Sequence, residues 1–485
     1  MEIKKENFTK INDFLWEVPR SFRKKMRVAA RIFASEEILK EALKDKSFEQ
    51  LINTTTLPGI VNYSLAMPDI HEGYGFPIGG VAATEYPNGA ISPAGIGFDQ
   101  NCGMRMLLSE YTQEDIKPYL EELSKEIQKN IPSGLGRGKQ TKLSNAEIDN
   151  ILKYGARFLV ERNYGEKEDL ENCESEGFLK EADSAFVSEK AKNRSRNQIG
   201  TLGSGNHFLE IQMVDEIFDK KAAEVFELFK NQTTFMIHTG SRALGHQNAT
   251  DYIHLIRKVM SKYKINVPDK DLACVPFSSP EGKRFFSAMC CGANYAFANR
   301  QMIAYQIRKS ARKILGTNFK LKMLYDVAHN IAKIEKHQVK INSKRQIKKV
   351  IVHRKGATRA FPPGHPEIPE KYKSIGQPVL IPGSMGTASY ILRGTKQGKE
   401  SFFSASHGSG RTMSRNEAIR KFPAQKIIEQ LNEKGIIVRF ACLRGISEEA
   451  PGAYKNIENV VSILDSLGLS KKVARLKPIA VIKGE

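Results

Sequence analysis

Two glycine- and proline-rich parts of the sequence do most to limit the folds open to this chain. Residues 57–107 and the chain beyond residue 350 hold short apolar runs between Gly and Pro, a pattern typical of strands joined by tight turns. Apolar residues at helical spacing predict helices over four other ranges, namely 14–55, 112–160, 214–230 and 279–315, and a last one near 415–433, before the strand-like GIIVRFACL. Helices and strands therefore mix without a regular βαβ alternation, which indicates an α+β fold.

No linker rich in Pro or Ser divides the chain. Its 485 residues suffice for one large domain or for two to three ordinary ones. We expect a single catalytic domain over residues 1–485, with mixed sheets, surrounding helices and a composite active site. Residues 130–197, which include GLGRGK and SEKAKNRSRNQ, are more polar, and we interpret them as a peripheral lobe or insertion.

Composition narrows the class of protein. The apolar fraction of 40% can fill a sizeable core, and no apolar run approaches the roughly 20 residues that span a bilayer. The N-terminus has no apolar stretch of a secretory signal, and the six cysteines lack the spacing of a disulfide framework. We therefore expect a cytoplasmic protein that makes no membrane contact. Its formal net charge of +21 suggests a polyanionic partner, with nucleic acid the leading candidate.

Most of that charge lies in one stretch. Residues 300–359 hold 17 Lys or Arg against 2 Asp or Glu, a net charge of +15. The stretch begins as an amphipathic helix, AYQIRKSARKIL, and continues as strand, turn and strand in INSKRQIKKVIVHRKGATR. Two interpretations stay open: a solvated face, or a track that neutralises the phosphates of a nucleic acid backbone.

The ten histidines are unevenly placed. Five lie in turns that carry Gly, Asn or Asp: His71, His207, His238, His329 and His407. Glycine lets the backbone approach a ligand closely, so five such settings together favour a binding site, although any one of them could be structural.

The segment GIGFDQNCGMR adds a carboxylate and a thiol. Asp99 and Cys102 lie three residues apart in a Gly-bounded turn, so both side chains can converge on one ion. Carboxylate, thiolate and imidazole ligands together describe a transition-metal site, for which Mn²⁺ and Zn²⁺ are both candidates. The alternative for Cys102 is a small buried apolar residue.

His407 has a different setting. The loop Ser406-His407-Gly408-Ser409-Gly410-Arg411 combines backbone donors with a fixed cation, which suits a phosphate beside an imidazole. An imidazole nitrogen can also attack phosphorus, although a ligand or structural role fits this histidine equally well. No GxxxxGK[ST] loop occurs, and no GxGxxG follows a strand in a βαβ context, which argues against a P-loop kinase or a Rossmann enzyme.

These pieces together resemble one family, the RtcB-type RNA-splicing ligases. The resemblance runs from MPDIHEGYGFPIGG to the terminal VIKG and covers most of the chain. It rests on motifs that follow one another in the family's order: GIGFDQNCGMR, GTLGSGNHFLEI, HTGSRALGHQ, DVAHNIAK, HRKGATRAFPPGHP, PGSMGTASY, HGSGRTMSR and EEAPGAYKNI.

The resemblance implies a reaction that uses GTP and two Mn²⁺ ions. RNA ending in a 3′-phosphate or 2′,3′-cyclic phosphate is joined to RNA with a 5′-hydroxyl, in tRNA splicing or RNA repair. His407 would carry GMP, pass it to the RNA 3′-phosphate as RNA–ppG, and the 5′-hydroxyl would then displace GMP. An archease-type activator is a further partner that the family suggests.

The resemblance also assigns residues. Cys102 would bridge both ions, with His207 and His238 completing one site and Asp99 and His329 the other. Asp69 would orient His407. The residues that would contact GMP and its phosphates are Asn206, Glu210, Ser384, Ser389, Gly408, Ser409, Gly410, Arg411, Tyr454 and Lys483. The residues that would contact the RNA backbone are Arg354, Lys355 and Arg359.

The sequence departs from the family's pattern beside the nucleophile, where Ser406 and Ser409 replace Cys and Ala. Two other functions stay open. One is a metal-dependent cyclic phosphodiesterase that uses the same Asp, Cys and His cluster without a covalent intermediate. The other is a non-catalytic RNA-binding module that depends on the basic surface.

Overall fold

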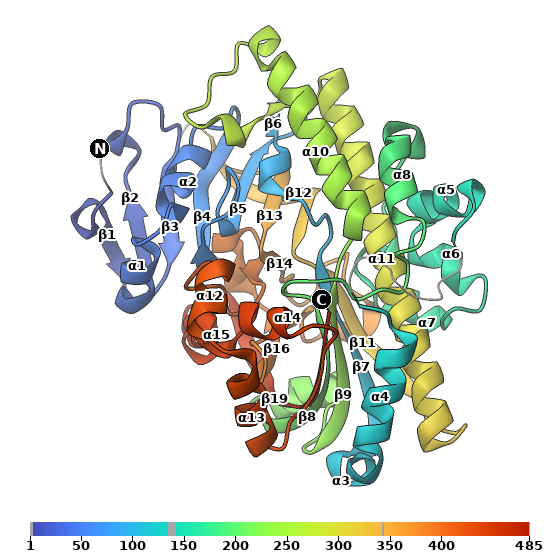
Figure 1. The fold of residues 1–485 in the computed structure, drawn as a ribbon. Helices are drawn as coiled ribbons and strands as arrows, with labels where there is room; N and C mark the ends of the chain where they lie inside the picture. The colour runs from blue at the N-terminus through green and yellow to red at the C-terminus, as the bar shows by residue number, and fades with distance from the viewer. Residues whose placement is uncertain (1–2, 134–141, 342–343, 485) are drawn as a thin grey trace.

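Two large mixed sheets, with helices around them, form the protein (Figure 1). The structure is a computed structural model that describes residues 3–133, 142–341 and 344–484. The expected α+β class is confirmed. Within the described ranges, no helix combines the length and the apolar character needed to cross a membrane.

The first sheet has seven strands in the order β1-β2-β3-β4-β5-β13-β12. Their bounds are β1 Thr9–Asn12, β2 Leu15–Val18, β3 Ala29–Phe33, β4 Ile60–His71, β5 Ile78–Glu85, β12 Asn330–Ile341 and β13 Lys344–Lys355. Neighbouring strands pair antiparallel, except that β3 and β4 are parallel. Apolar residues of this sheet form one core with helices α1 (Glu36–Ala42), α2 (Ser47–Thr54) and α15 (Ile457–Ser466).

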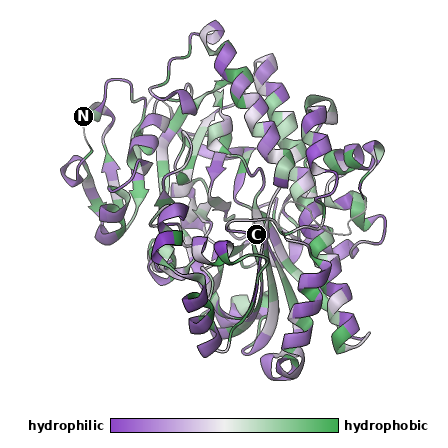
Figure 2. Ribbon diagram, viewed as in Figure 1, coloured by the Kyte–Doolittle hydropathy of each residue, from purple (hydrophilic) through white to green (hydrophobic). Residues whose placement is uncertain are grey.

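The second sheet has the order β11-β7-β9-β8-β19-β16-β15, and β18 pairs with β19. Its strands are β7 Gly103–Thr112, β8 Phe208–Ile217, β9 Gln232–Thr239, β11 Leu321–Ala328, β15 Pro378–Ile381, β16 Ser389–Gly394, β18 Ile437–Arg439 and β19 Ser470–Lys483. Two short pairs complete the strands: β6 (Ala90–Ile91) with β10 (Val275–Pro276), and β14 (Ala357–Arg359) with β17 (Ser404–Ser406). Hydrophobic residues follow the strands of this second sheet (Figure 2).

Helix α11, Pro280–Leu315, is the long helix that the apolar period predicts over residues 279–315. Ser279 caps it, because its hydroxyl accepts from the amide of Gly282, and Pro280 occupies the first turn, where no amide is needed. Together with α4 (Leu120–Asn130), this helix covers one face of the second sheet. The other helices are α3 Gln113–Ile116, α9 Lys220–Val225, α10 Arg242–Val259, α12 Arg415–Lys421, α13 Ala424–Glu433 and α14 Leu443–Glu448.

The prediction of helices over residues 14–55 is correct only for its second half. Residues 15–18 and 29–33 are the strands β2 and β3, whose side chains alternate between buried and partly buried positions. Trp16 and Val18 point into the core on one strand, and Ala30 and Ile32 on the next. This two-residue period is that of a half-buried strand, and it was hidden among polar residues in the sequence.

The polar segment 130–197 forms helices α5 (Asn145–Tyr154), α6 (Ala156–Val160), α7 (Lys167–Glu171) and α8 (Glu189–Ser195) at the edge of the molecule (Figure 1). Its residues 134–141, which contain GLGRGK, lie outside the described ranges. Ile148, Ile151 and Leu152 are fully buried in one cluster with α10 and α11, so apolar contacts join this segment to the rest of the molecule.

Candidate active site

Five neighbouring strands of the second sheet end at the same level, and the candidate ligands lie at these ends. In the sheet register, Gly103 pairs with Ala328 on one side and Thr239 on the other. The next pairs along are His238 with Phe208 and Phe208 with Lys483. Cys102, His207 and His329 are each one residue beyond such a strand end. The topology thus gathers residues that are up to about 380 positions apart in the chain.

A cavity of about 360 Å³ lies at these strand ends. Its walls include most of the predicted site residues: Asp99, Cys102, Asn206, His238, His329, Lys355, Ser384, His407, Gly408, Ser409, Gly410, Arg411, Tyr454 and Lys483. Four others, Asp69, His207, Glu210 and Ser389, are buried behind its lining. The first sheet contributes to the same cavity through His71 at the end of β4 and Lys355 at the end of β13.

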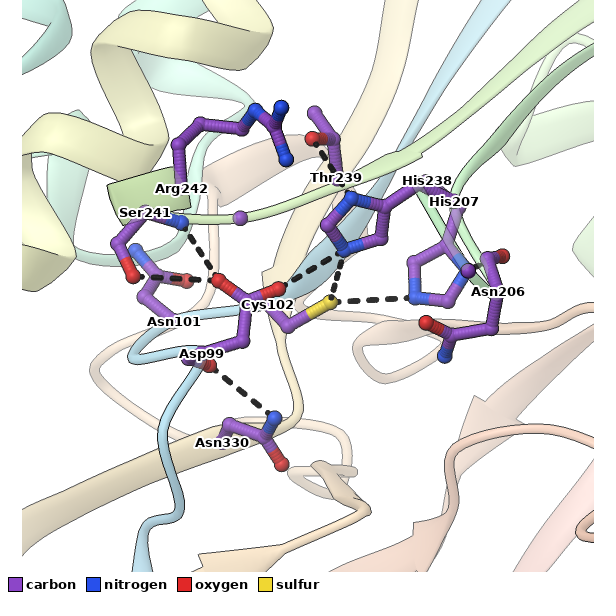
Figure 3. Close-up of polar contacts among 12 residues, drawn as sticks. Asp99, Asn101, Cys102, Asn206, His207, His238, Thr239, Ser241, Arg242 and Asn330 are labelled. Atoms are coloured by element: carbon purple, nitrogen blue, oxygen red, sulfur yellow. Dashed lines mark hydrogen bonds and ion pairs between the residues drawn. The ribbon is translucent and has the colours of Figure 1, made fainter. Parts of the chain in front are cut away.

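Two groups of potential metal ligands share Cys102. Figure 3 shows its sulfur between the rings of His207 and His238. Its Sγ lies 3.4 Å from Nε2 of His207 and 3.3 Å from Nε2 of His238. His207 Nε2 is also 2.8 Å from an oxygen of Asp99, while His238 Nε2 is 3.3 Å from Nε2 of His329. The groups are therefore Asp99 with His207, and His238 with His329. This corrects the expected division, which placed His207 with His238 and Asp99 with His329.

Backbone contacts orient the rings of this cluster. His207 Nδ1 donates to the carbonyl of Leu202 over 3.0 Å, and His238 Nδ1 donates to that of Asn206 over 3.1 Å. In a neutral ring the proton is then on Nδ1, so the Nε2 lone pair points at the thiol. Burial lowers the pKa of His238 and of His329 well below the ordinary value, which keeps both rings in the neutral form that binds metals.

The acidic members of the cluster also fit a cation. Burial opposes ionisation of Asp99, but His207, Cys102 and the charge of Arg242 together outweigh it and hold the pKa of Asp99 below its usual value. Burial and the nearby Asp99 raise the pKa of Cys102 well above that of an ordinary thiol. A bound divalent cation would reverse this and favour the thiolate. Three nitrogens, a sulfur and a carboxylate around two positions are a suitable donor set for transition metals.

Glycine is required beside Asp99. Its Oδ1 accepts from the Ser241 amide over 2.9 Å, in the loop that follows β9. A Cβ on the adjacent Gly240 would lie 2.3 Å from the same oxygen. The backbone of this loop can therefore hold the carboxylate only without a side chain at residue 240, which explains the HTG sequence after the strand.

His407 lines the same cavity, one residue beyond β17. Its Nδ1 is 2.5 Å from Oδ2 of the fully buried Asp69, and its backbone amide donates to the same oxygen over 3.0 Å. The expected contact between Asp69 and His407 is therefore present. The carboxylate holds the Nδ1 proton, so Nε2 keeps its lone pair. The His329 and His407 ring centroids are 5.0 Å apart, which places the imidazole next to the metal-ligand cluster.

The loop after His407 packs tightly on β4. Gly410 has φ +75°, and a Cβ there would come within 2.3 Å of the Asp69 carbonyl oxygen. Arg411 then points back towards Glu449, with Nη1 3.2 Å from the carboxylate and 3.2 Å from the hydroxyl of Tyr454. Tyr454 also donates to Glu449. The cation of the loop is thus fixed by a carboxylate and a phenol at the cavity wall.

Glu210 and Lys483 are buried on adjacent strands at a further wall. Burial raises the pKa of Glu210 to about 8, and this rise is only partly offset by Gln212 and by the charge of Lys483. Gln212 Nε2 donates to Glu210 over 2.7 Å and to Ser389 Oγ over 3.1 Å. Lys483 Nζ donates to the Gly205 carbonyl, and burial lowers its pKa. Hydrogen bonds thus join Glu210, Gln212 and Ser389 into one buried polar layer, with the charge of Lys483 beside it.

Two of the three expected RNA contacts are wrong, because Arg354 and Arg359 are buried inside the protein. Arg354 is fully buried and makes two hydrogen bonds to Glu335, of 2.6 and 2.9 Å. Arg359 is 1% exposed and pairs with Glu367 over 2.8 Å. Lys355 differs: it lines the cavity and donates to the carbonyls of Tyr74 and Phe76.

Two residues that support the ligands were not among the predicted site residues. Asn330 donates to the Asp99 carbonyl over 3.1 Å and accepts from the Gly356 amide, which joins the two sheets at the cavity. Arg300 is fully buried, pairs with Asp326 and donates to the Asn101 and Thr239 carbonyls beside the metal ligands. Asn330 directly follows His329 in the motif DVAHNIAK, which is the signal that could have identified it. Arg300 lies in the basic stretch, where nothing in the sequence separates it from the other cations.

Comparison with known proteins agrees with this geometry. The family model described as tRNA-splicing ligase RtcB matches residues 50–484. A protein of Methanococcus maripaludis named tRNA-splicing ligase RtcB is 49% identical over 99% of this chain and its own full length. A namesake from Thermococcus kodakarensis is 47% identical over 98% of both chains. The RNA-splicing ligase RtcB of Mycobacterium tuberculosis is 47% identical, over 90% of this chain and all of its own. Family match and strand-end site together show that this chain belongs to the RtcB family of tRNA-splicing ligases.

Proposed function

We propose that this protein is an RNA ligase of tRNA splicing that seals 3′-phosphate or 2′,3′-cyclic phosphate ends to 5′-hydroxyl ends through a histidine–GMP intermediate. One observation carries the proposal: the Asp69-bound His407, the shared-cysteine ligand cluster and the phosphate-suited loop 408–411 all meet at one cavity. Membership of the family and the names of its relatives support the same reaction class.

The ligand cluster suits two divalent cations, and Mn²⁺ accepts its mixture of oxygen, nitrogen and sulfur donors. Asp99, Cys102 and His207 would hold one ion, and Cys102, His238 and His329 the other. Such a pair neutralises phosphate charge and holds attacking and leaving oxygens in line. His407, Asp69 and Arg411 are not metal ligands in this proposal, and they act on the phosphates or on the imidazole ring directly.

His407 acts as the nucleophile in the first step. Its Nε2 attacks the α-phosphorus of GTP, a nitrogen–phosphorus bond forms, and the bond to pyrophosphate breaks. Asp69 stabilises the positive charge that develops on the ring, because its carboxylate already accepts the Nδ1 proton. Arg411 and the amides of Gly408–Gly410 lie where they can bind the phosphates.

The next two steps transfer GMP and then release it. An oxygen of the RNA 3′-phosphate attacks the phosphorus carried by His407, which returns the ring to its neutral form and leaves RNA–ppG. The 5′-hydroxyl oxygen of the second RNA then attacks the RNA 3′-phosphorus and displaces GMP, giving a 3′,5′-phosphodiester. A cyclic phosphate is first hydrolysed to the 3′-phosphate at the same site.

The polar layer behind the cavity fits recognition of guanine. Guanine offers two N–H donors on one edge. The buried carboxyl group of Glu210 has one described side-chain partner, the Gln212 amide, and can accept from these donors. Asn206, Ser384, Ser389, Tyr454 and Lys483 complete the proposed GMP contacts. The phosphate contacts are Gly408, Ser409, Gly410 and Arg411.

The test is formation of a GMP adduct. Wild-type protein incubated with Mn²⁺ and α-labelled GTP should carry label that survives denaturation, and mass spectrometry should place one GMP on the peptide with His407. His407→Ala should abolish the adduct. His365→Ala, which changes a histidine outside the cavity lining, is the matched control and should keep it. An adduct of wild-type strength in His407→Ala would refute the assignment of the nucleophile.

The same assay separates the other hypotheses. A phosphodiesterase without a covalent intermediate would open cyclic phosphate without GTP and give no adduct, and a binding module would do neither. The natural RNA, an archease-type activator and a cytoplasmic location stay predictions. For the RNA backbone we propose the exposed cations of the β12–β13 hairpin in place of Arg354 and Arg359.

A further inference from the structure

Three aromatic rings form a continuous row from the cavity wall to the surface of helix α10. The ring centroids of Tyr74 and Phe98 are 5.4 Å apart, and those of Phe98 and His246 are 5.1 Å apart with an interplanar angle of 27°. Tyr74 and Phe98 are partly exposed and line the cavity, while His246 is exposed. We call these three residues the aromatic ledge. No step of the proposed reaction uses any of them.

Contacts from the first sheet and from α10 hold Tyr74 in place. Lys355 Nζ donates to the Tyr74 carbonyl over 2.9 Å, and Arg257 Nη2 donates to the Tyr74 hydroxyl over 2.6 Å. The next residue, Gly75, has φ +63°, and a Cβ there would lie 2.3 Å from the Asp271 carbonyl oxygen. The Tyr74 ring is therefore held in place before any ligand binds, so that little ordering entropy is lost there on binding.

The ledge lies directly beside the reacting centre. Phe98 precedes Asp99, whose carboxylate belongs to the ligand cluster, and its ring lines the same cavity as His407. Glu210 and Lys483, which we propose for guanine, come from the strands β8 and β19 instead. An RNA end that delivers its phosphate or hydroxyl to this cavity must pass its terminal nucleotide over the rim.

We propose that the aromatic ledge is a nucleobase subsite, on which the terminal base of an RNA end stacks while its reacting group enters the cavity. The inference rests on the proposed function, because it takes RNA as the substrate. Aromatic rings bind bases through their faces with little sequence preference, which suits an enzyme that must accept different RNA ends. The shared chemistry is that of a nucleobase, and either the 3′-phosphate strand or the 5′-hydroxyl strand could supply it.

Binding of short RNAs tests the subsite. Fluorescence anisotropy with Mn²⁺ and without GTP would measure Kd for two ten-nucleotide RNAs, one with a 3′-phosphate end and one with a 5′-hydroxyl end. Each is also made with an abasic terminal nucleotide. The variants are Phe98→Leu, Tyr74→Leu and His246→Ala. Phe229→Leu is the matched control, because Phe229 is 38% exposed and lies outside the cavity lining.

We expect Phe98→Leu to weaken binding of one of the two strands roughly tenfold, the size of a missing base–aromatic stack. The abasic end should cost wild-type protein the same factor and cost Phe98→Leu nothing further. The strand that shows this non-additivity is the one that occupies the ledge. Wild-type affinity of all three variants for both strands, or losses that simply multiply, would overturn the proposal.

The GMP-adduct assay without RNA separates failure of the subsite from failure of the proposed function. Absence of an adduct in wild-type protein would refute the proposed reaction. The RNA-binding measurements would then still show whether the ledge binds a base. If Phe98→Leu also loses the adduct, the substitution has disturbed the neighbouring Asp99. In that case the RNA affinities of Tyr74→Leu and His246→Ala decide whether the ledge binds a base. A raised GTP requirement with unchanged RNA affinity would mean that the ledge holds guanine, which would overturn the proposal.

Discussion

The two halves of the β12–β13 hairpin both carry Lys and Arg, but the cations of one half are buried and those of the other are exposed. In the inner half, residues 330–335 and 350–355, the cations are buried. They are Lys333, Arg354 and Lys355. In the outer half, residues 336–341 and 344–349, the described cations are exposed: Lys336, Lys340, Lys344, Arg345, Lys348 and Lys349. Both halves belong to the basic stretch of residues 300–359.

Sheet register explains the difference. Strand β13 pairs with β12 along its whole length, but it pairs with β5 only from Val350 to Lys355. The inner half of β13 therefore lies between two strands of the seven-stranded sheet, where the buried guanidinium of Arg354 needs a carboxylate, which Glu335 supplies. The outer half of β13 extends beyond β5, where water solvates each charge. The basic stretch thus holds buried cations that are part of the core and exposed cations that lie on the surface.

The largest expected effect is on the inner half. Arg354→Met should lower the free energy of unfolding by about 3–5 kcal/mol, because it leaves the buried Glu335 without its guanidinium partner. Arg345→Met makes the same substitution in the exposed outer half and should change stability by less than about 0.5 kcal/mol. Chemical denaturation would measure both, and equal losses would remove the distinction between the halves.

A smaller effect is expected on RNA affinity from the outer half. Replacing Lys344, Arg345, Lys348 and Lys349 with Ala should flatten the dependence of log K on log salt by about 0.7 for each phosphate that is no longer neutralised. Binding titrations between low and moderate salt would show this, with stability unchanged. Ile347→Thr, at a position 75% exposed on the same ribbon, is the uncharged control. An unaltered salt slope would favour a merely solvated face.

The smallest effect concerns Lys355, the inner-half cation that lines the cavity. Burial lowers its pKa from 10.5 to about 7. Between pH 7 and 10 the unfolded chain therefore binds more protons at this residue, so unfolding free energy rises with pH. From pH 7 to 9 we expect wild-type protein to gain about 2 kcal/mol relative to Lys355→Met. Denaturation at both values would measure it, and a constant difference would contradict the burial argument.

Local pattern was enough for much of the fold. The α+β class, helix 280–315 and the strands of residues 57–107 follow from period and turn residues alone. The strands at 15–18 and 29–33 did not, because a period of two over four or five residues is too short to stand out against a helical neighbour. Their burial comes from sheet partners elsewhere in the chain.

The sequence by itself determined the candidate site residues: Asp99, Cys102, the clustered histidines and the loop after His407 are all recognisable in glycine-rich motifs. Only the tertiary structure decided how they group, because strand register at one sheet end brings His207 to Asp99 and His238 to His329. It also decided which charges face water. Arg354 is buried against Glu335 because β5 pairs with β13 at this residue. The type of a residue does not show how far a neighbouring strand extends, so the sequence alone could not exclude contact between Arg354 and RNA.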